Sequence, residues 1–169
     1  MEYFDILDRQ GNPIGQTAPK GSPLLPGQYY LGTHVYVHNA SAEFLIQQRA
    51  LHKKFLPGGW DICAEHTIAG ESSAECAKRG LLEEIGLDVP DKNLRLVLRL
   101  VREELSHITD VYFAQIDFDL AQLILAQDEV IGVKAISHGE MLELIASMVY
   151  RPKEYRRHIT NTVQKLTQA

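Results

Sequence analysis

Cysteine and positive charge are both scarce in this sequence. Only two cysteines occur in 169 residues, Cys63 and Cys76, and neither belongs to a C-x-x-C pair. This argues against a disulfide framework and predicts a reducing, cytoplasmic location. The formal net charge of -5 argues against a nucleic-acid partner, because proteins that bind nucleic acid usually carry a basic face.

Long apolar runs are absent as well. The amino terminus, MEYFDILDRQ, has neither a basic stretch nor an apolar stretch typical of a signal peptide. No run approaches the length of a membrane span, so we expect no membrane association. The hydrophobic content of 45% and the charged content of 23% are instead typical of a globular protein. The length predicts one domain over 1–169.

The patterns along the chain predict an α/β domain with a mixed sheet. Turn residues divide 1–28 into an amino-terminal hairpin and a loop. Helical periodicity predicts two carboxy-terminal helices within 138–169, at 138–148 and 152–167. The basic residues at 151–157 are expected to form an exposed helix face. Alternating or β-branched segments predict strands at 3–8, 29–40, 43–50, 94–101, 110–117 and 130–136.

A further helix is predicted between the strands, with clear start and stop signals. Ser72 and Glu75 have the spacing of a capping box, and Gly86 is a typical left-handed stop. Arg79 and the adjacent acids Glu83 and Glu84 lie within this helix. Residues three and four apart share a helix face, so the arginine and the first acid are expected to be neighbours.

Residues 65–87 resemble the signature of the Nudix hydrolase superfamily (MutT-like), G-x5-E-x7-R-E-U-x-E-E-x-G-U, where U is aliphatic. Two positions depart from it: Glu65 replaces the first glycine, and Gly80 replaces the glutamate after the arginine. The resemblance implies a Nudix-type α/β/α sandwich and, as a family expectation, a homodimer. The matching residues are Glu71, Arg79, Leu81, Glu83, Glu84, Gly86 and Leu87.

Carboxylates crowded on one helix raise each other's pKa unless a cation neutralises them. Hard oxygen ligands suit Mg²⁺ or Mn²⁺, which would offset the charge of a diphosphate and activate a water. The resemblance implies that Glu83 and Glu84 are metal ligands, with Glu83 also catalytic. It further implies that Arg79 orients the acids and that Glu71 supports them.

The substitution at Gly80 removes an acid that binds metal or acts as general base in the family, which predicts a weak or inactive enzyme. Glu65 suggests a repair, in which the carboxylate gained at position 65 replaces the one lost at position 80 and binds the metal. Alternatively, Glu65 simply points to solvent. An extra catalytic acid outside the box is also expected, with Glu129 favoured over Glu104.

The primary functional prediction is a divalent-metal-dependent pyrophosphohydrolase that cleaves a nucleoside diphosphate linked to another moiety. The alternative is an inactive Nudix domain that binds a nucleotide-like ligand. A third reading comes from the segment RALHKKFLPGGW, which also resembles isopentenyl diphosphate isomerases. However, Ala64 and Tyr30 stand where those enzymes carry a catalytic cysteine and a histidine ligand. Further candidates are His66 as a ligand and Arg49, Lys53 and Lys54 as phosphate contacts.

Overall fold

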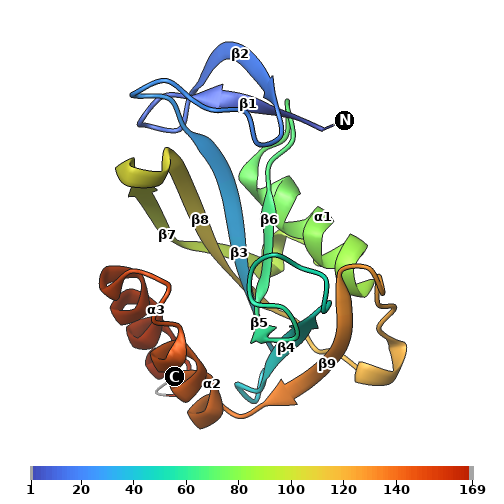
Figure 1. Ribbon diagram of the computed structural model, residues 1–169. Coiled ribbons are helices and arrows are strands. Elements are labelled where there is room, and N and C mark those ends of the chain that lie inside the picture. Colours follow the sequence, from blue (N-terminus) through green and yellow to red (C-terminus); the bar gives the residue numbers. More distant parts are fainter. Residues whose placement is uncertain (1, 168–169) are drawn as a thin grey trace.

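The computed structural model describes residues 2–167, so Met1 and residues 168–169 of the predicted ranges lie outside the described part. A seven-stranded mixed sheet forms its centre, and a separate two-stranded sheet lies at one end (Figure 1). The elements are β1 Tyr3–Leu7, β2 Pro13–Pro19, β3 Tyr30–His38, β4 Phe44–Arg49, β5 Trp60–Asp61, β6 Cys63–His66, α1 Ser73–Ile85, β7 Leu94–Arg102, β8 His107–Gln115, β9 Val130–Ile136, α2 His138–Ser147 and α3 Lys153–Lys165.

The central sheet has the strand order β5-β4-β3-β8-β7, with β6 paired to β3 and β9 paired to β4. Only β3 and β8 run parallel among the strand pairs within residues 2–167, and the other pairs are antiparallel. Helix α1 covers one face, whereas α2 and α3 pack against the other. The predicted α/β architecture with a mixed sheet is therefore confirmed.

Helix α1 begins and ends where the sequence signals place it. The Ser72 side chain accepts a hydrogen bond from the Glu75 backbone, and the Glu75 side chain accepts one from the Ser72 backbone. Gly86 ends the helix with φ of 70°, a left-handed conformation that glycine adopts at little cost. The apolar stripe, which includes Ala77, Leu81 and Ile85, is buried against the sheet. The opposite face is consequently free to carry charged side chains.

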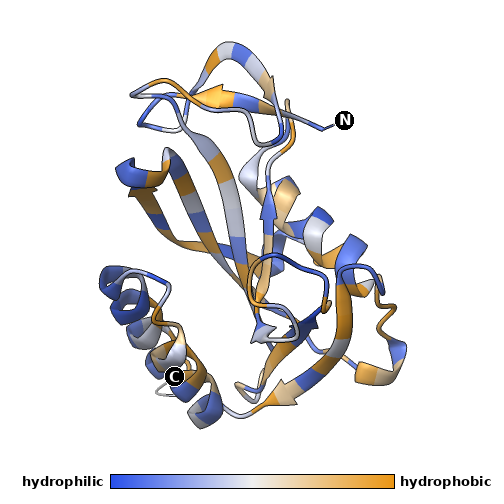
Figure 2. Ribbon diagram, viewed as in Figure 1, coloured by the Kyte–Doolittle hydropathy of each residue, from blue (hydrophilic) through white to orange (hydrophobic). Residues whose placement is uncertain are grey.

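Aromatic side chains fill the core beneath α2 and α3. Tyr36 and Phe113 stack with their ring centroids 5.1 Å apart, and Phe44 meets Phe113 edge to face. The two helices close this face with Met141 and Ile159, among others. Figure 2 shows the resulting division, in which the helices carry apolar residues in stripes and polar residues between them. No helix in residues 2–167 has both the length and the apolar character needed to cross a membrane.

The amino-terminal hairpin of β1 and β2 lies over the end of the central sheet (Figure 1). It is tied to the loop that precedes α1, because the Ala69 backbone donates to the Tyr3 carbonyl at 2.8 Å. The backbone N–H of Gly70 donates to the Asp5 carboxylate at 2.7 Å. The hairpin therefore contacts the very segment that leads into the acidic helix.

Two predictions about elements need correction. The strand expected at 110–117 runs from His107 to Gln115, because its parallel pairing with β3 extends it toward the amino terminus. The basic run 151–157 was expected to be an exposed face, but Arg151 is buried. Its guanidinium binds the carboxylate of Asp61, a partner that lies ninety positions away along the chain.

Candidate functional site

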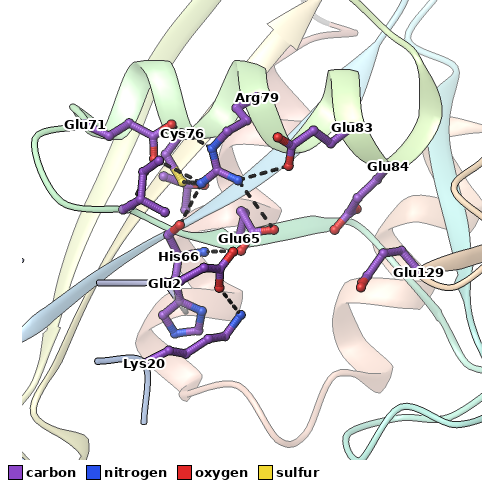
Figure 3. Close-up of polar contacts among 12 residues, drawn as sticks. Glu2, Lys20, Glu65, His66, Glu71, Cys76, Arg79, Glu83, Glu84 and Glu129 are labelled. Atoms are coloured by element: carbon purple, nitrogen blue, oxygen red, sulfur yellow. Dashed lines mark hydrogen bonds and ion pairs between the residues drawn. The ribbon is translucent and has the colours of Figure 1, made fainter. Parts of the chain in front are cut away.

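Four acidic side chains from three parts of the chain lie around a shared gap (Figure 3). Glu65 comes from β6, and Glu83 and Glu84 come from α1. Glu129 immediately precedes β9. The acids that the sequence singled out as metal ligands or catalytic groups are therefore brought to one place by the fold.

Arg79 holds one side of this cluster together. Its guanidinium donates to both carboxylate oxygens of Glu71 at 2.8 and 3.0 Å, to Glu83 at 3.1 Å and to the carbonyl of His66 at 2.9 Å. The nearest carboxylate oxygen of Glu65 is 4.0 Å away. The neighbourhood of Arg79 and Glu83 expected from helical spacing is present. The bonds from Arg79 to Glu71 and His66 join the loop before α1 to the helix itself.

Glu84 is the buried member of the cluster, with 7% of its surface exposed. Burial raises the pKa of its carboxyl to about 7; a hydrogen bond from Gln47 opposes this rise, and the nearby charges of Glu65 and Glu129 add to it. A divalent cation beside this carboxylate would favour its charged form and so oppose that rise. Sequence reasoning missed Gln47, although a glutamine within the apolar strand β4 was a signal for a buried polar contact.

Glu65 lies directly against Gly80. A Cβ atom added to Gly80 would be 3.2 Å from the Glu65 Cβ and 3.2 Å from the Cys63 Sγ. The side chain of Glu65 therefore fills the space beside position 80 from the opposite wall of the site. The two departures from the Nudix signature are in contact with each other, and any larger residue at position 80 would compete with Glu65 for room.

Glu129, rather than Glu104, lies beside the cluster. Glu129 forms an ion pair with Lys53, one of the candidate phosphate contacts, whereas Glu104 pairs with Arg102 at 2.8 Å in the turn between β7 and β8. Arg49 is engaged elsewhere, because it donates to the carbonyl of Phe55. Glu129 thus lies next to the acids of α1 (Figure 3).

His66 is not turned toward the acids. Adjacent residues of a strand point to opposite faces, so its ring lies away from the Glu65 carboxylate and stacks on Phe4 with centroids 5.5 Å apart. Within residues 2–167, no three His, Cys, Asp or Glu side chains are close enough together to hold a metal ion as they are placed. Ion binding at this cluster would therefore require rotation of its more exposed members, such as Glu83.

Comparison with known proteins agrees with this fold. The model of the NUDIX domain matches residues 29–158. The uncharacterized Nudix hydrolase lmo0368 of Listeria monocytogenes is 29% identical over 162 residues, which cover 95% of each chain. The chain therefore belongs to the Nudix family, and its class is that of a Nudix hydrolase.

Solved structures show the same fold. The crystal structure of DR0079 from Deinococcus radiodurans matches with a TM-score of 0.70 and 18% identity, covering 98% of this chain and 99% of that one. The NUDIX domain of NrtR from Shewanella oneidensis, crystallised with ADP ribose, matches with a TM-score of 0.55 and 16% identity over 75% of this chain and 81% of that one.

An isomerase is also among the relatives, at nearly the same identity. The isopentenyl-diphosphate Delta-isomerase of Pectobacterium atrosepticum is 28% identical over 158 residues, covering 89% of this chain and 83% of that protein. The site residues distinguish the two activities better than overall identity. Tyr30 donates its hydroxyl to the Ser22 carbonyl, Ala64 has no thiol, and burial raises the pKa of the Cys63 thiol well above its ordinary value. A reactive thiolate is therefore disfavoured at Cys63.

Proposed function

We propose that this protein is a Mg²⁺- or Mn²⁺-dependent pyrophosphohydrolase that cleaves a nucleoside diphosphate linked to another moiety. The observation that carries the proposal is the convergence of Glu65, Glu83, Glu84 and Glu129 on one gap. Carboxylate oxygens are the ligands that both cations prefer. The Nudix domain crystallised with ADP ribose supports a ligand of this chemical class. The two buried, unpaired cysteines fit the proposed cytoplasmic location.

The acids of the cluster divide into proposed metal ligands and a proposed base. Glu65, Glu83 and Glu84 would hold the cation, which supplies charge neutralisation at the diphosphate and a more acidic bound water. Glu129 lies outside the helix and forms an ion pair with Lys53. It is therefore proposed as the base that accepts a proton from the attacking water. Arg79 would keep Glu83 beside the other acids through the hydrogen bond between them.

Glu84→Gln should abolish metal binding without destabilising the folded protein. Saturating Mg²⁺ or Mn²⁺ is expected to raise the melting temperature of the wild-type protein, because a ligand at 100 times its Kd stabilises the folded state by about 2.7 kcal/mol. Glu84→Gln should lose this rise yet melt no lower than wild type in EDTA, since a buried charge is removed. Glu104→Gln serves as the control and should keep the rise.

The melting experiment has a clear contrary result. Equal metal-dependent shifts in wild type and Glu84→Gln would show that the cation binds elsewhere. A wild-type protein whose melting temperature does not respond to either cation would contradict the metal site altogether.

Turnover decides between hydrolysis and binding alone. The test is incubation with a panel of nucleoside diphosphate conjugates, including ADP ribose, with Mg²⁺, with Mn²⁺ and with EDTA. Metal-dependent release of a nucleoside monophosphate supports the hydrolase. The glycine at position 80 favours a second candidate, a Nudix domain that binds such a ligand without cleaving it. Thermal stabilisation by the conjugates without any release of product would support that candidate.

A further inference from the structure

The amino-terminal hairpin is part of the site although it lies outside the matched NUDIX residues 29–158. Its backbone and side-chain bonds to Ala69 and Gly70 hold it against the loop that leads into α1. A cavity of about 380 Å³ lies between the hairpin and the helix. Arg79 and Glu83 line one side of this cavity, so it borders the acid cluster at Glu83. A volume of this size is typical of small-molecule sites.

Lys20 brings a positive charge to the hairpin side of the cluster. Its ammonium group lies 2.8 Å from the carboxylate of Glu2, a residue that lines the cavity, and over the ring of Phe4. The hydrogen bond to Glu2 raises the pKa of Lys20, and the charges of Glu65 and Glu129 raise it further. Figure 3 shows Lys20 and Glu2 on the side of Glu65 away from Glu129.

The geometry points to Lys20 as a binding residue that leaves Glu2 and contacts a phosphate oxygen of the bound diphosphate. This inference rests on the proposed function, because it takes the ligand to be a diphosphate held at the acid cluster. The side chains of Lys20 and Glu2 are 56% and 52% exposed, and ion pairs so exposed contribute little net stability. A phosphate that enters the cavity is a stronger partner, since charge-assisted bonds to phosphate are short and strong.

The ion pair is not needed to close the hairpin. The backbone N–H of Lys20 donates to the Glu2 carbonyl at 2.9 Å, so the same two residues are already joined through the main chain. If the ion pair served only to hold the two ends of the hairpin together, removing either side chain would have the same effect on diphosphate binding. If Glu2 instead pairs with Lys20 only until a phosphate arrives, removing the Lys20 ammonium weakens diphosphate binding, whereas removing the Glu2 carboxylate does not.

The test is calorimetric binding of methylenediphosphonate, a diphosphate that cannot be hydrolysed, in saturating Mg²⁺. Lys20→Met should raise Kd about tenfold or more, because one charge-assisted bond is lost. Glu2→Gln should leave Kd unchanged or lower it, since the competing carboxylate is gone. Lys78→Met is the matched control, because it also removes one positive charge and one surface ion pair, that with Asp91. Its Kd should stay within twofold of wild type.

Three results would overturn the inference: a Lys20→Met Kd within twofold of wild type, a Glu2→Gln loss equal to that of Lys20→Met, or no binding by the wild-type protein. Lys20→Arg should retain most of the affinity if the variants fold normally. The inference can be separated from the proposed hydrolysis. If no substrate is cleaved but Lys20→Met still loses the diphosphonate, only the hydrolysis is wrong. If cleavage occurs and Lys20→Met keeps the wild-type KM, only the role of Lys20 is wrong.

Discussion

Glu65→Gln is expected to lower kcat by about 10²–10⁴-fold, because it removes a proposed ligand of the cation, whose stabilisation of transition-state charge is worth several kcal/mol. The double variant Glu65→Gly with Gly80→Glu is expected to recover most of that loss. The reason is the contact between the two positions, whose Cβ atoms would lie 3.2 Å apart if position 80 carried a side chain. A carboxylate carried by β6 at position 65 or by α1 at position 80 therefore reaches the same space between the acids.

Gly80→Glu alone should be harmful. Its Cβ would meet both Glu65 and the Cys63 Sγ at 3.2 Å, so the neighbours must shift, and a further negative charge joins an already crowded cluster. Removing the Glu65 side chain relieves one of the two contacts and the added charge. Both variants also replace a glycine inside a helix, which contributes up to about 1 kcal/mol of stability to each. The melting temperature of the double variant should exceed that of Gly80→Glu because the double variant lacks the contact with the Glu65 side chain and the added charge.

The readouts for this pair are kcat and Mg²⁺ affinity, with Glu104→Gln as the control that should match wild type in both. A double variant as slow as Glu65→Gln would show that the two positions do not exchange roles. A Glu65→Gln protein with wild-type kcat and wild-type Mg²⁺ affinity would show that Glu65 is an ordinary surface acid of the loop.

The elements that follow local signals could be predicted from the sequence. The capping box at Ser72 and the left-handed Gly86 are decided by residues within one or two turns, so the bounds of α1 were predicted closely. The strand at 130–136 was predicted in full from its apolar, β-branched pattern. The resemblance to the Nudix signature also suggested that positions 65 and 80 share one site, and in the structure a Cβ on Gly80 would lie 3.2 Å from the Glu65 Cβ.

Contacts between distant segments could not be predicted in this way. Gln47 meets Glu84 only because β4 lies beneath α1, and Lys20 reaches the site only because the hairpin folds back over the loop before α1. No local pattern specifies either contact. Arg151 was misread for the same reason: its neighbours in sequence are charged, but its partner Asp61 comes from β5.

This buried pair joins the carboxy-terminal helices to the sheet. Arg151, between α2 and α3, donates through Nη2 to both carboxylate oxygens of Asp61 at 3.0 and 3.2 Å. The two residues are 9% and 1% exposed. Nη1 of Arg151 also contacts the ring of His34 at 2.9 Å, and Tyr155 from α3 bonds to the same ring. Asp61 is therefore the acid that balances a guanidinium removed from water.

Asp61→Ala is expected to lower the free energy of unfolding by about 3–5 kcal/mol, because removing one partner leaves the other charge buried and uncompensated. The Nε of Arg151 is already a buried donor without a hydrogen-bond partner among the described residues. Acceptors around this guanidinium are therefore already too few, and loss of the carboxylate would leave further buried donors unpaired. The measurement is the urea midpoint followed by circular dichroism, with the slope m checked for two-state behaviour.

Two further variants distinguish the effect of losing the ion pair from the effect of losing side-chain packing. Asp91→Ala breaks an exposed ion pair with Lys78 and should leave the urea midpoint nearly unchanged. The double variant Asp61→Ala with Arg151→Met removes both buried charges and should recover much of the stability that Asp61→Ala loses, since an apolar side chain costs less to bury than an unpaired cation. Additive losses in the double variant would show that the two residues stabilise the fold independently, so that charge pairing is not what holds the helices to the sheet.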